Sequence, residues 1–232
     1  MGTSVSPRSP AGSRTWTMVR ATIQNGAPPG EVLAAMMYAA SSDEWLTILE
    51  SPGVNVYAER VAVAWQDMPD QLRHGGAREV VADILEQTRA DALSAGGDGV
   101  AVALTERALA RVLLERLTSR DRETDEPADL PAAWQANRGL TPGELAGSLL
   151  VETMRQVASH FFARDAAAVT GGTAIPDARA LRQLTRQVGD AAADTAQQAR
   201  AMLRDRGPEA WADGVRLTFR TAARWRPPGG PV

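Results

Sequence analysis

The chain has 232 residues, enough for one large domain or two small ones and for a core that needs no covalent staples. It contains no cysteine, which excludes disulfides, thiol catalysis and thiolate metal sites. The net charge of −3 excludes a uniformly positive surface, and no apolar run reaches the roughly 18 residues of a membrane-spanning helix. We therefore expect a cytoplasmic protein with no membrane partner.

The composition favours helices. Aromatic residues make up only 5% of the chain, and alanine, the best helix former, is abundant, whereas strands prefer aromatic and β-branched residues. All 25 basic residues are arginine, and this bias runs through the whole chain. Codon bias in a GC-rich genome explains it more simply than selection for guanidinium chemistry.

The first segment, residues 1–30, is rich in Ser, Thr, Pro and Gly, carries arginines and contains no Asp or Glu. This composition is typical of a disordered tail, and the segment has no apolar run of the kind a secretory signal needs. Met18 is an alternative start, because Val19 and Ile23, the first residues expected to pack, follow it.

From residue 31 onward, apolar residues recur at helical spacing. Two short runs, Val54–Trp65 and Val100–Leu104, also fit buried strands that could pair, but helical period continues after each and favours helices. The expected helices cover residues 31–40, 42–49, 54–65, 77–93, 100–119, a short stretch around Trp134, 141–169, 177–206 and the segment that Pro208 opens. We predict an all-α fold, a multi-helix bundle of roughly seven to nine helices.

We expect residues 31–226 to form a single helical domain, followed by a frayed tail at 227–232. The segment 120–131 is densely charged and contains two prolines, so it is the best position for a sub-division. A solvated loop is the simpler interpretation of this segment. The alternative is an acidic docking motif for a basic partner.

The segment 141–169 is the expected centre of the bundle. Thr141, Pro142 and Glu144 have the spacing of a capping box with proline at the first helical position. The apolar residues that follow cover more than half of the helix circumference, which is typical of a central helix. They are Leu145, Leu149, Leu150, Val151, Thr153, Met154, Val157, Ala158, Phe161 and Phe162.

The clearest candidate surface is a ridge on the last helix. Arg216, Arg220 and Arg224 lie at i, i+4 and i+8, and Arg226 follows them. Such a ridge could bind phosphates or an acidic partner. Arginines near a helix C-terminus are also stabilised by the helix dipole, and only Trp225 is available there to stack on bases, so a solvated face is the simpler interpretation.

The candidate pocket lies around His160. Glu152, Gln156 and His160 form a row at helical spacing, which suggests acid–base chemistry or a partial metal site, and His74 could approach them in space. No pair with HxxxH or ExxH spacing is present, so we expect neither a metal nor a cofactor. A histidine at the edge of the core is the simpler interpretation.

These features leave three functional hypotheses. The first is a non-enzymatic helical interaction protein, a scaffold or assembly subunit of a bacterial complex that binds a protein partner or forms a homo-oligomer. The second is a helical subunit of a nucleoprotein machine that contacts phosphates through the C-terminal arginine ridge. The third is an enzyme or small-ligand binder with an interhelical pocket near His160.

Overall fold

The computed structural model describes residues 14–39, 42–72, 76–117, 130–165 and 175–222. These residues form an all-α fold of eleven α-helices and one short 3-10 helix, and they contain no strand. The elements are α1 (Arg14–Gln24), α2 (Pro29–Ala39), α3 (Ser42–Leu49), α4 (Pro52–Leu72), α5 (Ala77–Ser94), α6 (Gly99–Leu117), α7 (Leu130–Asn137), α8 (Pro142–Asp165), α9 (Ala178–Thr195), α10 (Gln197–Arg206), η3 (Pro208–Ala210) and α11 (Trp211–Ala222).

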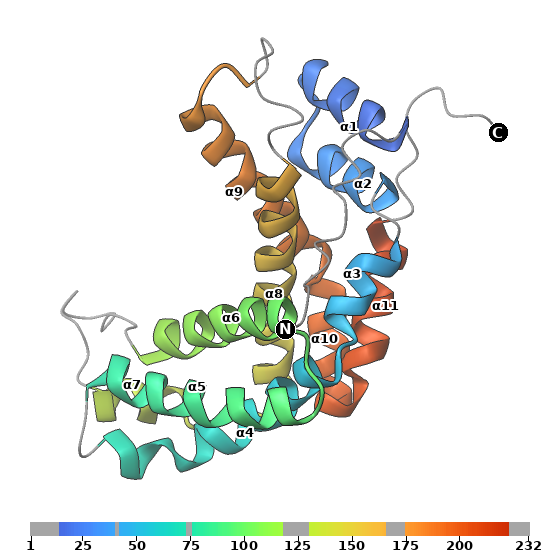
Figure 1. Cartoon of the computed structure of the whole chain (residues 1–232). Helices are drawn as coiled ribbons and strands as arrows, with labels where there is room; N and C mark the ends of the chain where they lie inside the picture. Colours follow the sequence, from blue (N-terminus) through green and yellow to red (C-terminus); the bar gives the residue numbers. More distant parts are fainter. Residues whose placement is uncertain (1–13, 40–41, 73–75, 118–129, 166–174, 223–232) are drawn as a thin grey trace, which may run out of the picture.

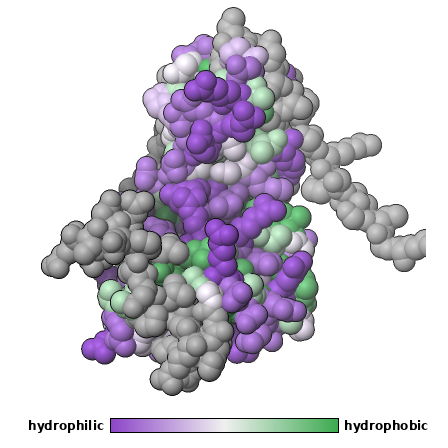
Figure 2. Space-filling view, turned by 90° about the vertical axis from the view of Figure 1, so that its left-hand side faces the viewer, coloured by the Kyte–Doolittle hydropathy of each residue, from purple (hydrophilic) through white to green (hydrophobic). Residues whose placement is uncertain are grey.

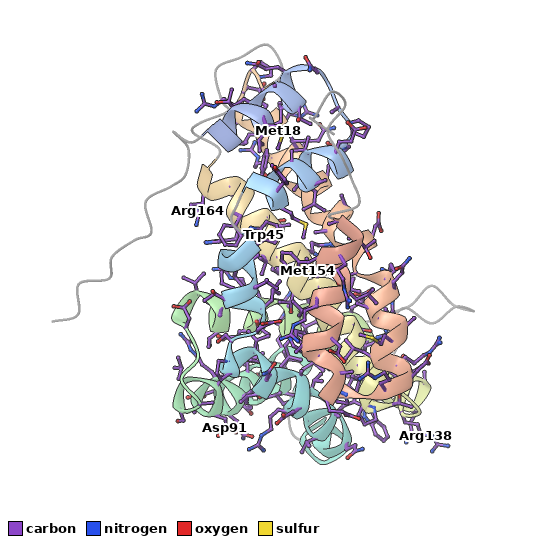
Figure 3. The ribbon with its side chains drawn as sticks, turned by 90° about the vertical axis from the view of Figure 1, so that its right-hand side faces the viewer. Met18, Trp45, Asp91, Arg138, Met154 and Arg164 are labelled. Carbon is purple, nitrogen blue, oxygen red and sulfur yellow. The ribbon has the colours of Figure 1, made fainter. Side chains whose placement is uncertain are left out.

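The bundle is arranged around α8, which runs upright through the middle of the molecule (Figure 1). Helices α4 and α6 pack on one side of it, α9 and α10 on another, and α5 packs on both α4 and α6. Helices α1 and α2 pack on each other at one end, where α2 also contacts α9. Figure 3 shows Met154 of α8 near the middle, Met18 at the end formed by α1 and α2, and Asp91 and Arg138 at the opposite end.

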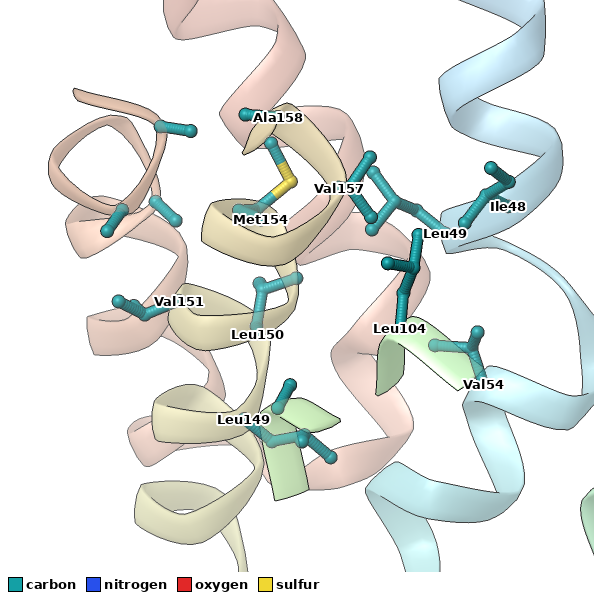
Figure 4. Close-up of a cluster of buried hydrophobic side chains, with 14 of the residues drawn as sticks. Ile48, Leu49, Val54, Leu104, Leu149, Leu150, Val151, Met154, Val157 and Ala158 are labelled. Atoms are coloured by element: carbon teal, nitrogen blue, oxygen red, sulfur yellow. The ribbon is translucent and has the colours of Figure 1, made fainter. Parts of the chain in front are cut away.

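The central position predicted for α8 is confirmed by its burial. All ten apolar-face residues predicted in the sequence are buried, including its one threonine. Figure 4 shows Leu149, Leu150 and Val157 packed together with side chains from α3, α4 and α6. The ring of Trp45 in α3 stacks on Phe161, with 5.1 Å between ring centroids. Burial around α8 therefore holds the surrounding helices in one core.

Helix α8 approaches α9 and α10 closely because glycines face them. A Cβ atom on Gly143 would collide with the carbonyl oxygen of Leu203, and one on Gly147 would lie 3.0 Å from the carbonyl oxygen of Arg200. On α9, a Cβ atom on Gly189 would collide with the hydroxyl of Ser159. Side chains at these positions would push the helix axes apart.

The prediction of a disordered tail over residues 1–30 is wrong for the second half of that segment. Residues 14–24 form α1, whose Val19 and Ile23 are buried, and α2 begins at Pro29. Gly26 has a φ of +68°, which turns the chain between the two helices. Burial of a short apolar stripe against α2 outweighs the polar composition on which the expectation rested. Residues 1–13 lie outside the described part of the chain.

The long helix expected at 177–206 is broken at Ala196 into α9 and α10. The hydroxyl of Thr195 donates a hydrogen bond to the carbonyl of Ala191 at 2.8 Å, a side-chain contact that is known to bend helices. The break lets both halves pack against α8. Together with α1, it explains why more helices are present than the seven to nine expected.

Other expectations hold. Val54–Trp65 and Val100–Leu104 lie within α4 and α6, so both are helical. The capping box is present: the N–H of Thr141 donates to the Glu144 carboxylate at 2.8 Å, and the N–H of Glu144 donates to the Thr141 hydroxyl at 3.2 Å.

The expected boundary at 120–131 falls largely outside the described residues, and the tail at 227–232 falls wholly outside them.

We predict that Gly143→Ala destabilises the fold by about 1–3 kcal/mol, because the added methyl group forces α8 away from α10. Chemical denaturation of the purified protein measures the change. Gly30→Ala in α2 is the matched control: no atom lies within 4 Å of the added Cβ, so stability should stay the same or rise slightly. Equal effects of the two substitutions would contradict close packing at Gly143.

A second prediction concerns pH. The hydrogen bond from the Thr141 N–H lowers the pKa of Glu144 below its ordinary value of 4.5. A lowered folded-state pKa adds stability above the unfolded-state value, and this stability is lost as pH falls through the folded-state value. Glu144→Gln should therefore cost roughly 0.5 kcal/mol at pH 7 and less as the pH falls below 4.5, measured by urea unfolding across this range. A cost that does not change with pH would argue against this role.

Candidate functional site

The arginine ridge predicted on the last helix is partly engaged within the molecule. Nε of Arg216 on α11 lies 2.9 Å from the Glu50 carboxylate, directly after α3. Nε of Arg220 donates to the backbone carbonyl of Arg216 at 3.3 Å. The Arg216–Glu50 pair helps to hold α11 in place, whereas the Arg220 contact lies within α11 itself. Arg224 and Arg226 lie outside the described residues.

In the row predicted on α8, the first two residues, Glu152 and Gln156, contact each other. The amide of Gln156 donates to the Glu152 carboxylate at 2.8 Å. His160, two turns after Glu152, is half-buried, and its ring lies edge-on to Phe161 with 5.7 Å between centroids. His74 lies outside the described residues, so its approach to His160 stays a prediction.

In this arrangement the Glu152 carboxylate joins neighbouring helices. Its side chain is 5% exposed, and both Arg155 and Arg111 of α6 pair with it, the latter at 3.4 Å. Arg155 also reaches Asp190 of α9 at 3.0 Å. Two arginines and an amide thus occupy the carboxylate, which ties α6, α8 and α9 together. Within the described ranges, no cluster of three or more His, Asp or Glu residues could hold a metal ion.

Tyr57 is the other buried titratable group of note. Its ring is fully buried on α4, and its hydroxyl has no hydrogen-bond partner among the described residues. Burial raises the pKa of Tyr57 far above its ordinary value, and the negative charge of Glu106 raises it further. The phenol therefore stays protonated at neutral pH and is too weak an acid for proton transfer there.

A second row of arginines, which the sequence analysis missed, lies on α9. Arg179, Arg182 and Arg186 are spaced at i, i+3 and i+7, and all three side chains are exposed. We call these three residues the arginine row. In the part of the chain that the structure describes, none of them forms an ion pair. The spacing is readable in the sequence, but the apolar stripe of the same helix dominates the pattern.

The nearest carboxylates on α9 are used elsewhere. Asp177 caps the helix and accepts hydrogen bonds from the backbone N–H groups of Arg179 and Ala180, both at 2.8 Å. Asp190, one turn after Arg186, is held by Arg155 of α8. Asp177 and Asp190 therefore already make contacts within the fold.

A groove runs beside the arginine row, between α9 and the turn that joins α1 to α2. We call it the α2–α9 groove; its cavity volume is about 330 Å³, and its walls combine aliphatic side chains with two amides. Its lining residues are Ile23, Gly26, Ala27, Val32, Ala180, Gln183, Leu184 and Gln187. Figure 2 shows that the upper part of the face on which α9 lies is largely hydrophilic.

Comparison with known proteins adds no relative: no family model, no curated protein and no solved structure matches this chain. None of the helices in the described ranges is both long enough and apolar enough to cross a membrane.

We predict that Glu152→Gln destabilises the protein by about 1–3 kcal/mol, because charge-assisted bonds to two arginines are lost. Thermal or urea unfolding measures the change. Glu115→Gln on α6 is the control, because that side chain is exposed and its loss should cost less than about 0.5 kcal/mol. A carboxylate placed for chemistry commonly costs stability, so a more stable Glu152→Gln variant would contradict the structural role.

Proposed function

We propose that the protein is a non-enzymatic helical interaction protein, a scaffold or assembly subunit of a bacterial complex in the cytoplasm. The observation that carries this proposal is the α2–α9 groove with its adjacent arginine row. Aliphatic walls beside exposed charges are the features of a protein-binding surface, where an apolar centre is bordered by a polar rim. A protein partner or a second copy of the chain would bind there.

The other two hypotheses receive less support. The second hypothesis, a nucleoprotein role, depends on the ridge on α11, where Arg216 already pairs with Glu50. The third hypothesis, an enzyme or small-ligand binder, depends on a pocket near His160, where the Glu152 carboxylate is already paired with two arginines. Arg216 and Glu152 thus already form ion pairs within the fold. The arginine row beside the α2–α9 groove, in contrast, forms no ion pair within the described residues.

The test is an assembly measurement on the full chain. We expect light scattering to give a mass above that of the monomer, either for the chain alone or for the chain with a partner co-purified from its native host. Ala180→Trp places a large ring in the groove and should weaken the assembly at least about tenfold, because it blocks the apolar contact.

Ala90→Trp is the matched control, since Ala90 is an exposed position on α5, away from the groove, and should leave assembly unchanged. A chain that stays monomeric and retains no partner would count against the proposal. So would an assembly that the two tryptophan variants affect equally.

A further inference from the structure

The arginine row is placed where the helix least favours it. Arg179 and Arg182 lie in the first turn and a half of α9, and this turn contains no acidic residue. The N-terminus of a helix carries a partial positive charge, so cations there are destabilising. Asp177, the acid at the N-cap, already accepts hydrogen bonds from two backbone N–H groups on its Oδ1.

The three arginines also repel one another. Arg182 lies three residues after Arg179 and four before Arg186, so each is a neighbour of a like charge on the helix surface. Asp190, which could offset Arg186, pairs with Arg155 instead. Within the described residues the row thus carries an electrostatic cost with no compensating contact. Such departures from local rules are expected at functional sites.

The surface beside the row has a different character. Ile23 and Val32, which line the α2–α9 groove, are 6% and 1% exposed, and Leu184 also lines it. Gln183 and Gln187 stand on α9 next to Leu184 and can donate hydrogen bonds. An occupant that fits this surface needs an apolar stripe for the groove and negative charges beside it.

We propose that the α2–α9 groove binds an acidic amphipathic helix of a partner protein, with carboxylates of that helix on Arg179, Arg182 and Arg186. This inference rests on the proposed function and adds the chemistry of the partner. The row spans seven residues, about 10 Å along α9, which matches two turns of a second helix. Helix-in-groove binding uses apolar anchors at this spacing, and the carboxylates set orientation and specificity.

Nucleic acid fits the same charges less well. A phosphate backbone needs no aliphatic groove, and neither the groove nor the arginine row contains an aromatic residue on which a base could stack. The charges and the apolar walls together therefore favour a helix with one acidic and one apolar side.

The test is a selection of helices on the full-length protein. The probe is a displayed library of amphipathic helical peptides. Each peptide keeps an apolar stripe, and all positions beside that stripe are randomised. We expect the enriched peptides to carry Asp or Glu at i, i+3 or i+4, and i+7 beside an apolar stripe. Their affinity, measured by fluorescence anisotropy, should fall as salt concentration rises.

Two variants test the row directly. Arg179→Gln, Arg182→Gln and Arg186→Gln together should weaken the selected peptides at least about tenfold, because three charge pairs are lost. The control combines Arg78→Gln, Arg107→Gln and Arg138→Gln, which removes the same charge from exposed positions on other elements and should change affinity less than about twofold. Gln183→Glu with Gln187→Glu adds negative charge at the groove and should also weaken binding.

Three outcomes would overturn this inference: no enrichment of any helix, enrichment of helices without acidic residues, or equal loss in the row variant and its control. Binding of a 20-base-pair DNA duplex that is lost in the row variant would assign the row to phosphates instead. If the chain assembles and Ala180→Trp disrupts the assembly while the row variant does not, the proposed function stands and the acidic helix is wrong.

Discussion

The close approach of α8 to α9 and α10 is the constraint on which the rest of the structure depends. It requires Gly143 and Gly147 on one helix and Gly189 on the other, because a methyl group at any of them would meet backbone or side-chain atoms. Interiors this dense transmit strain, so α9 and α10 have little freedom to slide along α8. The packing of α4, α6 and α3 on the remaining faces of α8 then completes the core.

The surface of α9 follows from that constraint. Once Val188, Gly189 and Ala192 are buried against the bundle, the opposite side of the helix must face outward. The Arg155–Asp190 pair ties the same helix to α8 and removes the acid that would otherwise neutralise Arg186. The groove exists because α2 also packs on α9, so its walls come from segments about 150 residues apart in the sequence.

Periodicity predicted those parts of the fold in which one helix carries its own signal. The apolar width of α8 and the capping box at Thr141 are local patterns, and both were read correctly. The helix at 14–24 was missed because its polar composition hides a short apolar stripe that packs against α2. The break at Ala196 was missed because no Gly or Pro marks it, although both halves of the helix pack on α8.

The arginine ridge on α11 and the arginine row on α9 show why a candidate site is harder to predict than a helix. Spacing identifies both, since each consists of arginines on one side of a helix. What separates them is the position of carboxylates: Glu50, 166 residues from Arg216 in the chain, reaches α11, whereas Asp190, only four residues from Arg186, is drawn away to α8. Whether an ion pair forms depends on tertiary distance, which the sequence does not show. The sequence therefore identified the ridge on α11, whose first arginine pairs with Glu50. It did not identify the arginine row on α9, which forms no ion pair within the described residues.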